Sequence, residues 1–197
     1  MTRILILVGS LRAGSTNRQL AEAAVKLAPD GVEVVPFDAL ADIPFYNEDI
    51  DVEGSVPAAA AGLREAARSC DAFLLFCPEH NGTVPAVLKN AIDWLSRPRG
   101  AGAFGGKPVA VVGATFGRYG GVWAQDAARK AASIAGGKVI EGLKLSVPGS
   151  LTRFAETHPA DDTELAAQLT EIIAGLHSHV DEAAGATQLL SDAARRH

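Results

Sequence analysis

The sequence is poor in cysteine and has no long apolar run. Its 197 residues include two cysteines and no CxxC pair. Cys70 and Cys77 lie before and at the end of one apolar run, where an extended strand would hold their sulfurs too far apart to bond, so we predict free, buried or half-buried thiols. No apolar stretch approaches the roughly 20 residues of a transmembrane helix, and the N-terminal run is too short for a signal peptide. We therefore expect a cytoplasmic protein.

The sequence also lacks a strong charge of either sign. The formal net charge is −5, which gives no electrostatic reason to expect binding to nucleic acid or to an anionic membrane. With 48% hydrophobic and 21% charged residues, the composition is that of an ordinary globular domain. The length predicts one domain over residues 1–180, followed by a C-terminal tail over 181–197 that could add a short helix.

Groups of side chains with the spacing of metal ligands are missing as well. Glu48, Asp49 and Asp51 lie in one irregular segment without partner ligands. His177 and His179 point to different sides of a predicted helix, which is typical of a solvated face. We therefore predict that the protein has no metal site.

Short apolar runs alternate with segments of helical periodicity along the chain. We expect strands at 4–8, 32–37, 72–77, 109–112 and within 138–147, and helices at 17–28, 58–69, 84–95, 122–135 and 163–177. Thr83 is the candidate N-cap of the third helix, with Pro85 in its first turn. This alternation predicts an α/β fold, a doubly wound parallel sheet of five strands with helices on both faces. The irregular connection at 39–57 is longer than a compact domain usually has without a purpose.

Three loops that leave predicted strands are rich in glycine, hydroxyl and amide groups. They are GSLRAGSTN (9–17), PEHNGT (78–83) and ATFGRYGG (114–121). In doubly wound sheets, ligands bind outside the carboxyl ends of the strands, which is where these loops begin. We therefore expect the three loops to form one binding site.

The first loop contains one arginine and no lysine. It matches neither the GxxxxGK[ST] pattern that binds a polyphosphate with magnesium nor the GxGxxG pattern of dinucleotide sites. Its hydroxyls, Arg12 and the N-terminus of the following helix suit a single phosphate. The alternative is that Ser15 only caps a helix.

These loops carry a resemblance to a known family. GSLRAGSTN, PFYNED (44–49), PEHNGTVPAVLKNAIDWLSRP (78–98) and GRYGG (117–121) occur in the order in which the NADPH-dependent FMN reductase family has similar motifs, over roughly the first 150 residues. That family includes flavodoxin-like quinone, azo and chromate reductases. The resemblance implies a three-layer flavodoxin-like sheet of strand order 2-1-3-4-5, bound FMN, reduction by NADPH or NADH, and a homodimer or homotetramer.

The resemblance also implies roles for single residues. For the FMN phosphate these are Ser10, Arg12, Ser15, Thr16 and Asn17, with Arg18 as a neighbour. For the flavin ring and ribityl chain they are Pro78, Glu79, His80, Asn81, Gly82 and Thr83. The other edge of the ring would meet Thr115, Gly117, Arg118 and Gly120. Arg97, Arg99 and Arg118 are candidates for the phosphate of NAD(P)H, the alternative being that they are solvated surface charges.

One residue departs from the family pattern. His80 stands where the family commonly has tyrosine. Imidazole can still lie flat against a flavin, but it is smaller than a phenol and can take up a proton near neutral pH. We expect an altered flavin affinity or potential and not a loss of binding.

The function that the resemblance implies needs no catalytic side chain, because the flavin itself carries the electrons. It is the transfer of a hydride from NAD(P)H through FMN to a small quinone-like, azo or metal-oxyanion acceptor. One alternative is a flavin reductase that releases reduced FMN to a partner monooxygenase. Others are a non-enzymatic flavodoxin-type electron carrier, although such carriers are typically strongly acidic, and a regulatory protein that binds no flavin.

Overall fold

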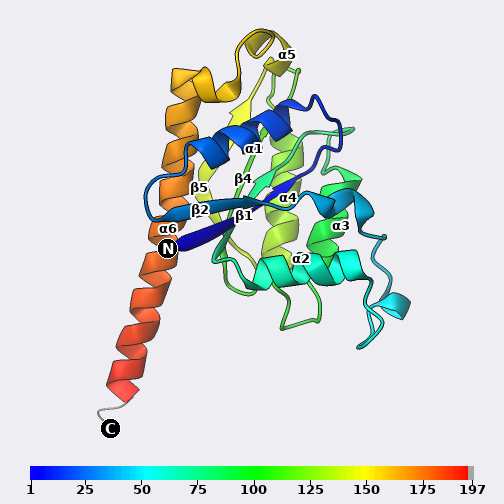
Figure 1. Cartoon of the computed structure of the whole chain (residues 1–197), viewed down its shortest axis with the longest axis vertical. Helices are drawn as coiled ribbons and strands as arrows, with labels where there is room; N and C mark the ends of the chain where they lie inside the picture. Colours follow the sequence, from blue (N-terminus) through cyan, green and yellow to red (C-terminus); the bar gives the residue numbers. More distant parts are fainter. Residues whose placement is uncertain (195–197) are drawn as a thin grey trace.

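The centre of the molecule is a five-stranded sheet in which all strands are parallel (Figure 1). The computed structural model describes the backbone of residues 1–194 and the side chains of residues 1–186. The strands are β1 (Thr2–Val8), β2 (Val32–Pro36), β3 (Ala72–Phe76), β4 (Pro108–Ala114) and β5 (Lys138–Val147). Their order is β2-β1-β3-β4-β5. The predicted flavodoxin-like sheet and its strand order are thus confirmed.

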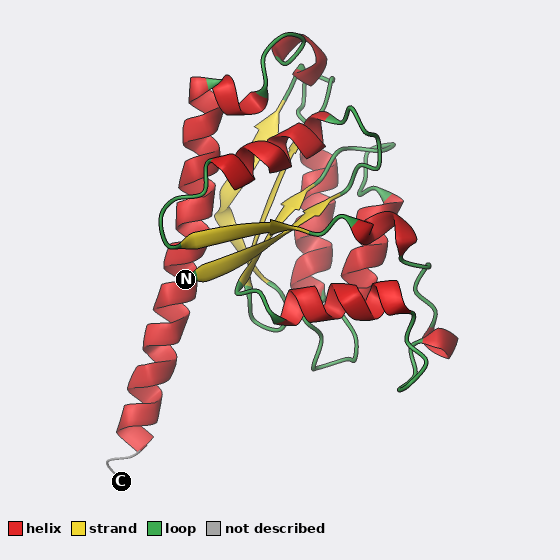
Figure 2. Ribbon diagram, viewed as in Figure 1, coloured by secondary structure: helices red, strands yellow, loops and turns green. Residues whose placement is uncertain are grey.

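Helices cover both faces of the sheet, because successive side chains of a strand point to opposite faces (Figure 2). On β1, Leu5 and Leu7 join one buried apolar cluster while Ile4 and Ile6 join the other. The first cluster packs under α2 (Ala58–Arg68), α3 (Ala86–Leu95) and α4 (Val122–Ile134). The second packs under α1 (Thr16–Lys26) and α6 (Thr163–Ala194). The result is the predicted three-layer arrangement.

Helix α3 begins later than the sequence predicts. Thr83 is not its N-cap, because the main chains of His80 and Thr83 exchange two hydrogen bonds of 3.1 Å and hold residues 80–83 in a separate turn. Pro85 stands at the N-cap position, and the first helical residue is Ala86. The prediction was wrong because the turn holds Thr83 two residues before the N-cap position.

Helix α6 is continuous from Thr163 to Ala194, so the predicted end at His177 and the separate short helix after it are wrong. The predicted domain boundary at 180 falls inside this helix. Residues 163–194 contain no proline and are rich in alanine and leucine, so no strong helix breaker ends the helix earlier. The C-terminal half of α6 extends away from the sheet (Figure 1). The predicted tail residues 195–197 lie outside the described part.

The long connection at 39–57 is ordered by contacts with α3. It contains the short helices η1 (Ala39–Asp42) and η2 (Glu48–Ile50). The Asn90 side chain accepts a hydrogen bond from the Tyr46 N–H at 2.8 Å and donates one to the Pro44 carbonyl at 3.0 Å. The Trp94 indole N–H donates to the same Pro44 oxygen at 2.8 Å. Side chains of α3 therefore replace the regular hydrogen bonding that the segment lacks.

An ion pair with little solvent exposure closes the same connection. The Arg64 guanidinium of α2 donates two hydrogen bonds to the Asp51 carboxylate, at 2.6 and 2.8 Å. The two side chains are 7% and 11% exposed. Hydrogen bonding from Arg64 lowers the pKa of Asp51 below its ordinary value. Asp51 is therefore a structural anion that holds the connection to α2.

Both cysteines are buried and free, as predicted. Burial raises the pKa of Cys70 to about 11 and that of Cys77 to about 12. Within the described residues, no helix is both long enough and apolar enough to cross a membrane. The same residues contain no group of three or more His, Cys, Asp or Glu side chains placed to hold a metal ion.

Candidate flavin site at the carboxyl edge of the sheet

The three loops singled out in the sequence lie at the carboxyl ends of β1, β3 and β4, which are neighbours in the sheet. A cleft of ≈ 510 Å³ separates the second loop from the third, and its walls are formed by residues 79–82 and 115–117. The first loop lies against the second, since the Gly9 N–H donates to the Phe76 carbonyl at 2.8 Å. A Cβ at Gly9 would lie 3.1 Å from Pro78 Cδ, so glycine permits this close approach.

The first loop ends at a helix N-terminus whose donors are available. Ser15 occupies the N-cap position of α1 and is 2% exposed, yet its hydroxyl makes no capping hydrogen bond. Ser15 thus stands at the cap position that the alternative prediction gave it, and its role toward an anion stays a prediction. Arg18, one turn further on, has a buried Nε with no hydrogen-bond partner in the described part of the chain. Free amides at a helix N-terminus, a spare hydroxyl and an unpartnered guanidinium nitrogen fit an anion.

The side chain of Asn17 is bonded to the end of β4. Its side-chain Nδ2 donates to the Ala114 carbonyl at 2.9 Å, and its Oδ1 accepts from the Ala114 N–H at 3.0 Å. Both side-chain groups are thus committed to the end of β4, and Asn17 is 4% exposed. Its main-chain N–H has no acceptor among the described residues and remains available to an anion. The side chain instead fixes the position of α1 relative to the third loop.

The second loop is a preformed turn. Asn81 and Gly82 both have positive φ, of 53° and 76°, between the mutually bonded His80 and Thr83. This is the arrangement of a type I′ turn, for which Asn-Gly is the favoured sequence. The N–H groups of His80 and Thr83 are used within the turn, while those of Asn81 and Gly82 have no acceptor among the described residues. The loop therefore presents two free amides at the cleft.

The third loop is held by a buried glutamine that the sequence reasoning missed. Gln125 of α4 is 0% exposed, its Nε2 donates to the Gly120 carbonyl at 2.9 Å, and its Oε1 accepts from the Ser146 hydroxyl at 2.9 Å. The Glu79 carboxylate accepts a hydrogen bond of 3.3 Å from the Ala124 N–H in the first turn of α4. Glu79 thereby ties the second loop to the helix that follows the third.

Arg118 lies in the third loop beside the cleft. Its guanidinium carbon lies 4.6 Å from the centre of the Tyr119 ring, and the side chain is exposed. Within the described residues, no carboxylate forms an ion pair with it. Arg118 follows Gly117 of the cleft wall, and its contact with a cofactor stays a prediction.

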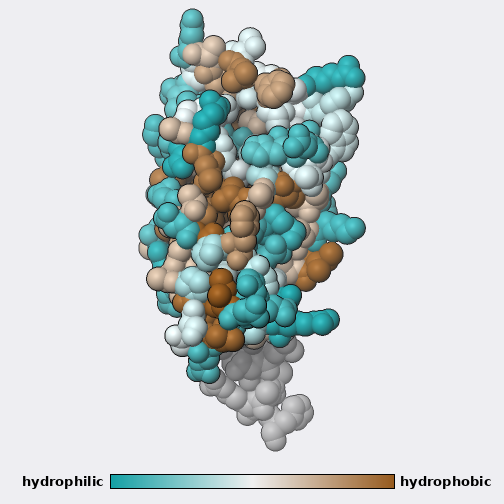
Figure 3. Space-filling model, turned by 90° about the vertical axis from the view of Figure 1, so that its right-hand side faces the viewer, coloured by the Kyte–Doolittle hydropathy of each residue, from teal (hydrophilic) through white to brown (hydrophobic). Residues whose placement is uncertain are grey.

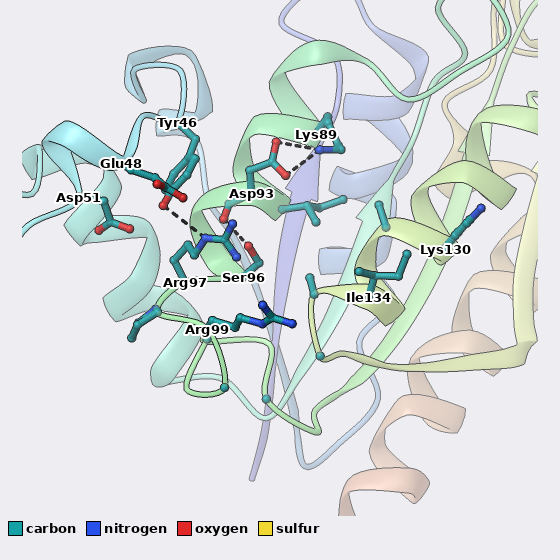
Figure 4. A pocket seen from close by; sticks show the side chains of 18 of the residues that line it. Tyr46, Glu48, Asp51, Lys89, Asp93, Ser96, Arg97, Arg99, Lys130 and Ile134 are labelled. Atoms are coloured by element: carbon teal, nitrogen blue, oxygen red, sulfur yellow. Dashed lines mark hydrogen bonds and ion pairs between the residues drawn. The ribbon is translucent and has the colours of Figure 1, made fainter.

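Arg97 and Arg99 lie elsewhere in the chain. Both line a second groove, of ≈ 1240 Å³, between the C-terminal ends of α3 and α4 (Figure 4). The Arg97 Nε donates to the Tyr46 hydroxyl at 3.3 Å, which raises the pKa of Arg97 above its usual range. Helix α3 begins next to the cleft and is about 15 Å long, so these arginines are not at the cofactor mouth of the same chain. From the sequence, Arg97 and Arg99 could be assigned to a loop after the third helix. The sequence did not show that this helix carries the loop away from the carboxyl edge of the sheet.

The residues of the cleft fit FMN. The α1 terminus offers Ser15, Arg12 and free amides for one phosphate. The turn at 80–83 offers free amides for the polar edge of a planar ring, beside the apolar ring of Phe116. A helix N-terminus with free amides and an amide-lined cleft at the same sheet edge suit the two ends of a flavin mononucleotide.

Comparisons with known proteins agree with this geometry. The family model described as NADPH-dependent FMN reductase matches residues 2–152. A quinone reductase from Pseudomonas putida is 45% identical over 127 residues, which are 64% of this chain and 67% of that protein. A 2-hydroxy-1,4-benzoquinone reductase from Burkholderia sp. is 40% identical over 123 residues, 62% of this chain and 66% of that protein. The chain thus spans about two thirds of the length of these relatives.

A solved structure extends the likeness beyond the matched sequence. The flavoenzyme NAD(P)H:(acceptor) oxidoreductase FerB from Paracoccus denitrificans superposes with a TM-score of 0.82, at 27% identity, covering 92% of this chain and 98% of that one. The match over residues 2–152 contains all three loops of the cleft. From the cleft, the sheet order and this match together, the chain belongs to the NADPH-dependent FMN reductase family.

Proposed function

We propose that this protein binds FMN and transfers two electrons from NAD(P)H to a quinone. The overall reaction converts NAD(P)H, one proton and the quinone into NAD(P)⁺ and the hydroquinone, so electrons and protons balance. The proposal is carried by one observation: the Asn17–Ala114 pair joins the N-terminus of α1 to the end of β4, beside the amide-lined cleft. The relatives named quinone reductase support the choice of acceptor.

When bound, FMN supplies the hydride and electron chemistry, and the protein supplies position. Ser15, Arg12 and the first amides of α1 hold the phosphate end. The free N–H groups of Asn81 and Gly82 donate to the polar edge of the ring. Because these donors sit in a preformed turn, they fix the orientation of the ring without a conformational change on binding. His80 and Phe116 both line the cleft and border the space left for substrates.

Azo compounds and metal oxyanions are further acceptors that we propose for the same site, because an exposed reduced flavin is not selective for one acceptor. We propose a cytoplasmic location, which agrees with the two free thiols. We also propose a homodimer or homotetramer. On the side where α3 lies, apolar side chains gather in the middle of the surface (Figure 3). Phe45 and Ile134 are each 78% exposed. Light scattering of the purified protein tests the assembly.

The experiment that tests the function begins with the absorbance spectrum of the purified protein. We expect flavin bands, bleaching on anaerobic addition of NADH or NADPH, and recovery on addition of a quinone, an azo dye or chromate. A protein that bleaches but loses its reduced flavin on gel filtration is a flavin reductase that serves a partner. A flavin that neither nucleotide bleaches indicates an electron carrier. A protein that binds no FMN disproves the proposal.

A further inference from the structure

Phe116 is a large apolar side chain left exposed beside the candidate flavin site. It is 79% exposed, whereas Phe73, Phe76 and Phe104 are fully buried. It lines the same cleft as His80, on the third loop. An exposed aromatic ring beside a pocket is free to stack on a ligand that binds there.

The exposure of Phe116 does not come from a loose loop. The Thr115 N–H donates to the Val147 carbonyl at 3.0 Å, and the Thr115 carbonyl accepts from the Ser150 N–H at 3.0 Å. On the other side, the Gly117 carbonyl accepts from Gly120 at 3.3 Å and from Gly149 at 3.4 Å. Hydrogen bonds on both neighbours hold the main chain, so the fold itself places this ring at the cleft.

Phe116 also has no aromatic partner within the described residues, unlike the aromatic side chains that follow it. Tyr119 and Trp123 pack on each other with ring centres 5.1 Å apart, and Arg118 covers Tyr119. These two rings pack against each other, and neither lines the cleft. Phe116 is therefore the cleft aromatic whose ring faces are open to a ligand.

We propose that Phe116 is the specificity-determining residue that selects planar, ring-shaped acceptors by stacking on them. This inference rests on the proposed function and deepens it. The side chain has no polar group and takes no part in electron or proton transfer. It increases the residence of a planar ring at the cleft, and it gives no such advantage to a compact, hydrated anion such as ferricyanide.

The test separates acceptor reduction from the reaction with NAD(P)H. FMN-loaded protein is reduced with dithionite, and its reoxidation by menadione or by ferricyanide is followed by stopped-flow absorbance. In Phe116→Ala we expect the second-order rate constant with menadione to fall about tenfold, equal to ~1.4 kcal/mol of binding. The rate constant with ferricyanide should change less than about twofold, and Phe116→Tyr should restore the menadione rate.

Two further measurements complete the design. Oxidised, FMN-loaded protein is titrated with 2-naphthol, a planar ring that the protein cannot reduce, and its dissociation constant should rise about tenfold in Phe116→Ala. Trp123→Ala, at an aromatic of 54% exposure outside the cleft, is the matched control and should behave as wild type. Melting temperature and FMN affinity show whether each variant remains folded and loaded.

The outcomes distinguish this inference from the function on which it rests. Equal loss of rate with menadione and ferricyanide, or unchanged 2-naphthol binding, would show that Phe116 does not select acceptors. A parallel loss of FMN affinity would mean that the ring supports the flavin instead. If wild-type protein binds no FMN, or if its reduced form reacts with neither acceptor, the proposed function fails first.

Discussion

Asn17 and Ala114 are joined by two hydrogen bonds, of 2.9 and 3.0 Å, that connect the N-terminus of α1 to the end of β4. Asn17→Ala leaves the buried N–H and carbonyl of Ala114 unpaired. We expect the free energy of unfolding, measured by urea titration without FMN, to fall by about 2 kcal/mol. Asn47→Ala is the control, because the Asn47 side chain accepts a single bond from Asp49 at an exposed site, and it should cost well under half of that. Unchanged stability with weakened FMN binding would return Asn17 to the role of phosphate ligand.

The phosphate site is tested by comparing FMN with riboflavin, which lacks the phosphate. Arg12→Ala and Ser15→Ala should each weaken FMN binding about tenfold, the effect of one hydrogen bond to a charged group. Riboflavin affinity, measured by the same flavin-fluorescence titration, should not change. If both variants retain FMN as tightly as wild type, the phosphate lies elsewhere.

His80 allows a test of flavin tuning. The imidazole lines the cleft and is smaller than the phenol that the family commonly has at this position. We expect the midpoint potential of bound FMN, measured at one fixed pH, to differ between wild type and His80→Tyr. Spectroelectrochemical titration measures both potentials, and potentials that coincide would remove His80 from this role.

Arg118 and Arg97 are expected to differ in their effect on nucleotide choice. Arg118 lies beside the cleft, and its loss should lower the ratio of NADPH to NADH reduction rates because a cation near the 2′-phosphate favours NADPH. Arg97 lies in the groove at the other end of α3, so within one chain Arg97→Ala should leave the ratio unchanged. A changed ratio for Arg97→Ala would indicate that a second copy of the chain brings this groove to the site.

The Asp51–Arg64 pair predicts a dependence of stability on pH. The pKa of Asp51 is lowered in the folded protein, so the pair stabilises the fold above the ordinary value of 3.8. That contribution is lost as the pH falls from 3.8 through the lowered pKa. At neutral pH, Asp51→Ala should cost about 3 kcal/mol, because it leaves Arg64 buried without its partner.

Urea titrations from about pH 7 to about pH 2.5 measure this difference, which should shrink at the acid end. Asp93→Ala removes the exposed Lys89–Asp93 pair of α3, with side chains 49% and 39% exposed, and should cost under about 0.5 kcal/mol. Equal effects of the two substitutions would show that burial of the Asp51 pair is unimportant.

The sequence predicted the sheet well because its signals are local. Each strand is a short apolar run, and a residue such as Leu74 in β3 is buried whichever face it points to. The loop motifs were equally readable, since the Asn81-Gly82 pair favours one kind of turn wherever it occurs. The places of these loops in the sheet follow from the alternation of strands and helices.

The contacts that the sequence did not show are those between distant residues. Gln125 meets Ser146 across 21 positions, and Asn17 meets Ala114 across 97. No local sequence pattern identifies Gln125 or Asn17 as a residue that holds a loop of the site in place. Asn17 was interpreted as a phosphate ligand. The end of α6 was missed for a different reason, since periodicity fades where one side of a helix no longer meets a core, although the helix itself continues.

The burial of both thiols makes the chain suitable for single-site labelling. Cys70 is 5% exposed and Cys77 is fully covered, and their high pKa values leave almost no thiolate at neutral pH. A maleimide dye or a nitroxide spin label should therefore not react with the two native thiols and should attach only to an introduced cysteine. Asn81→Cys would place such a probe at the tip of the turn beside the cleft. The fluorescence or the electron-resonance line shape of the probe would then report ligand binding. The two native cysteines would not have to be replaced first.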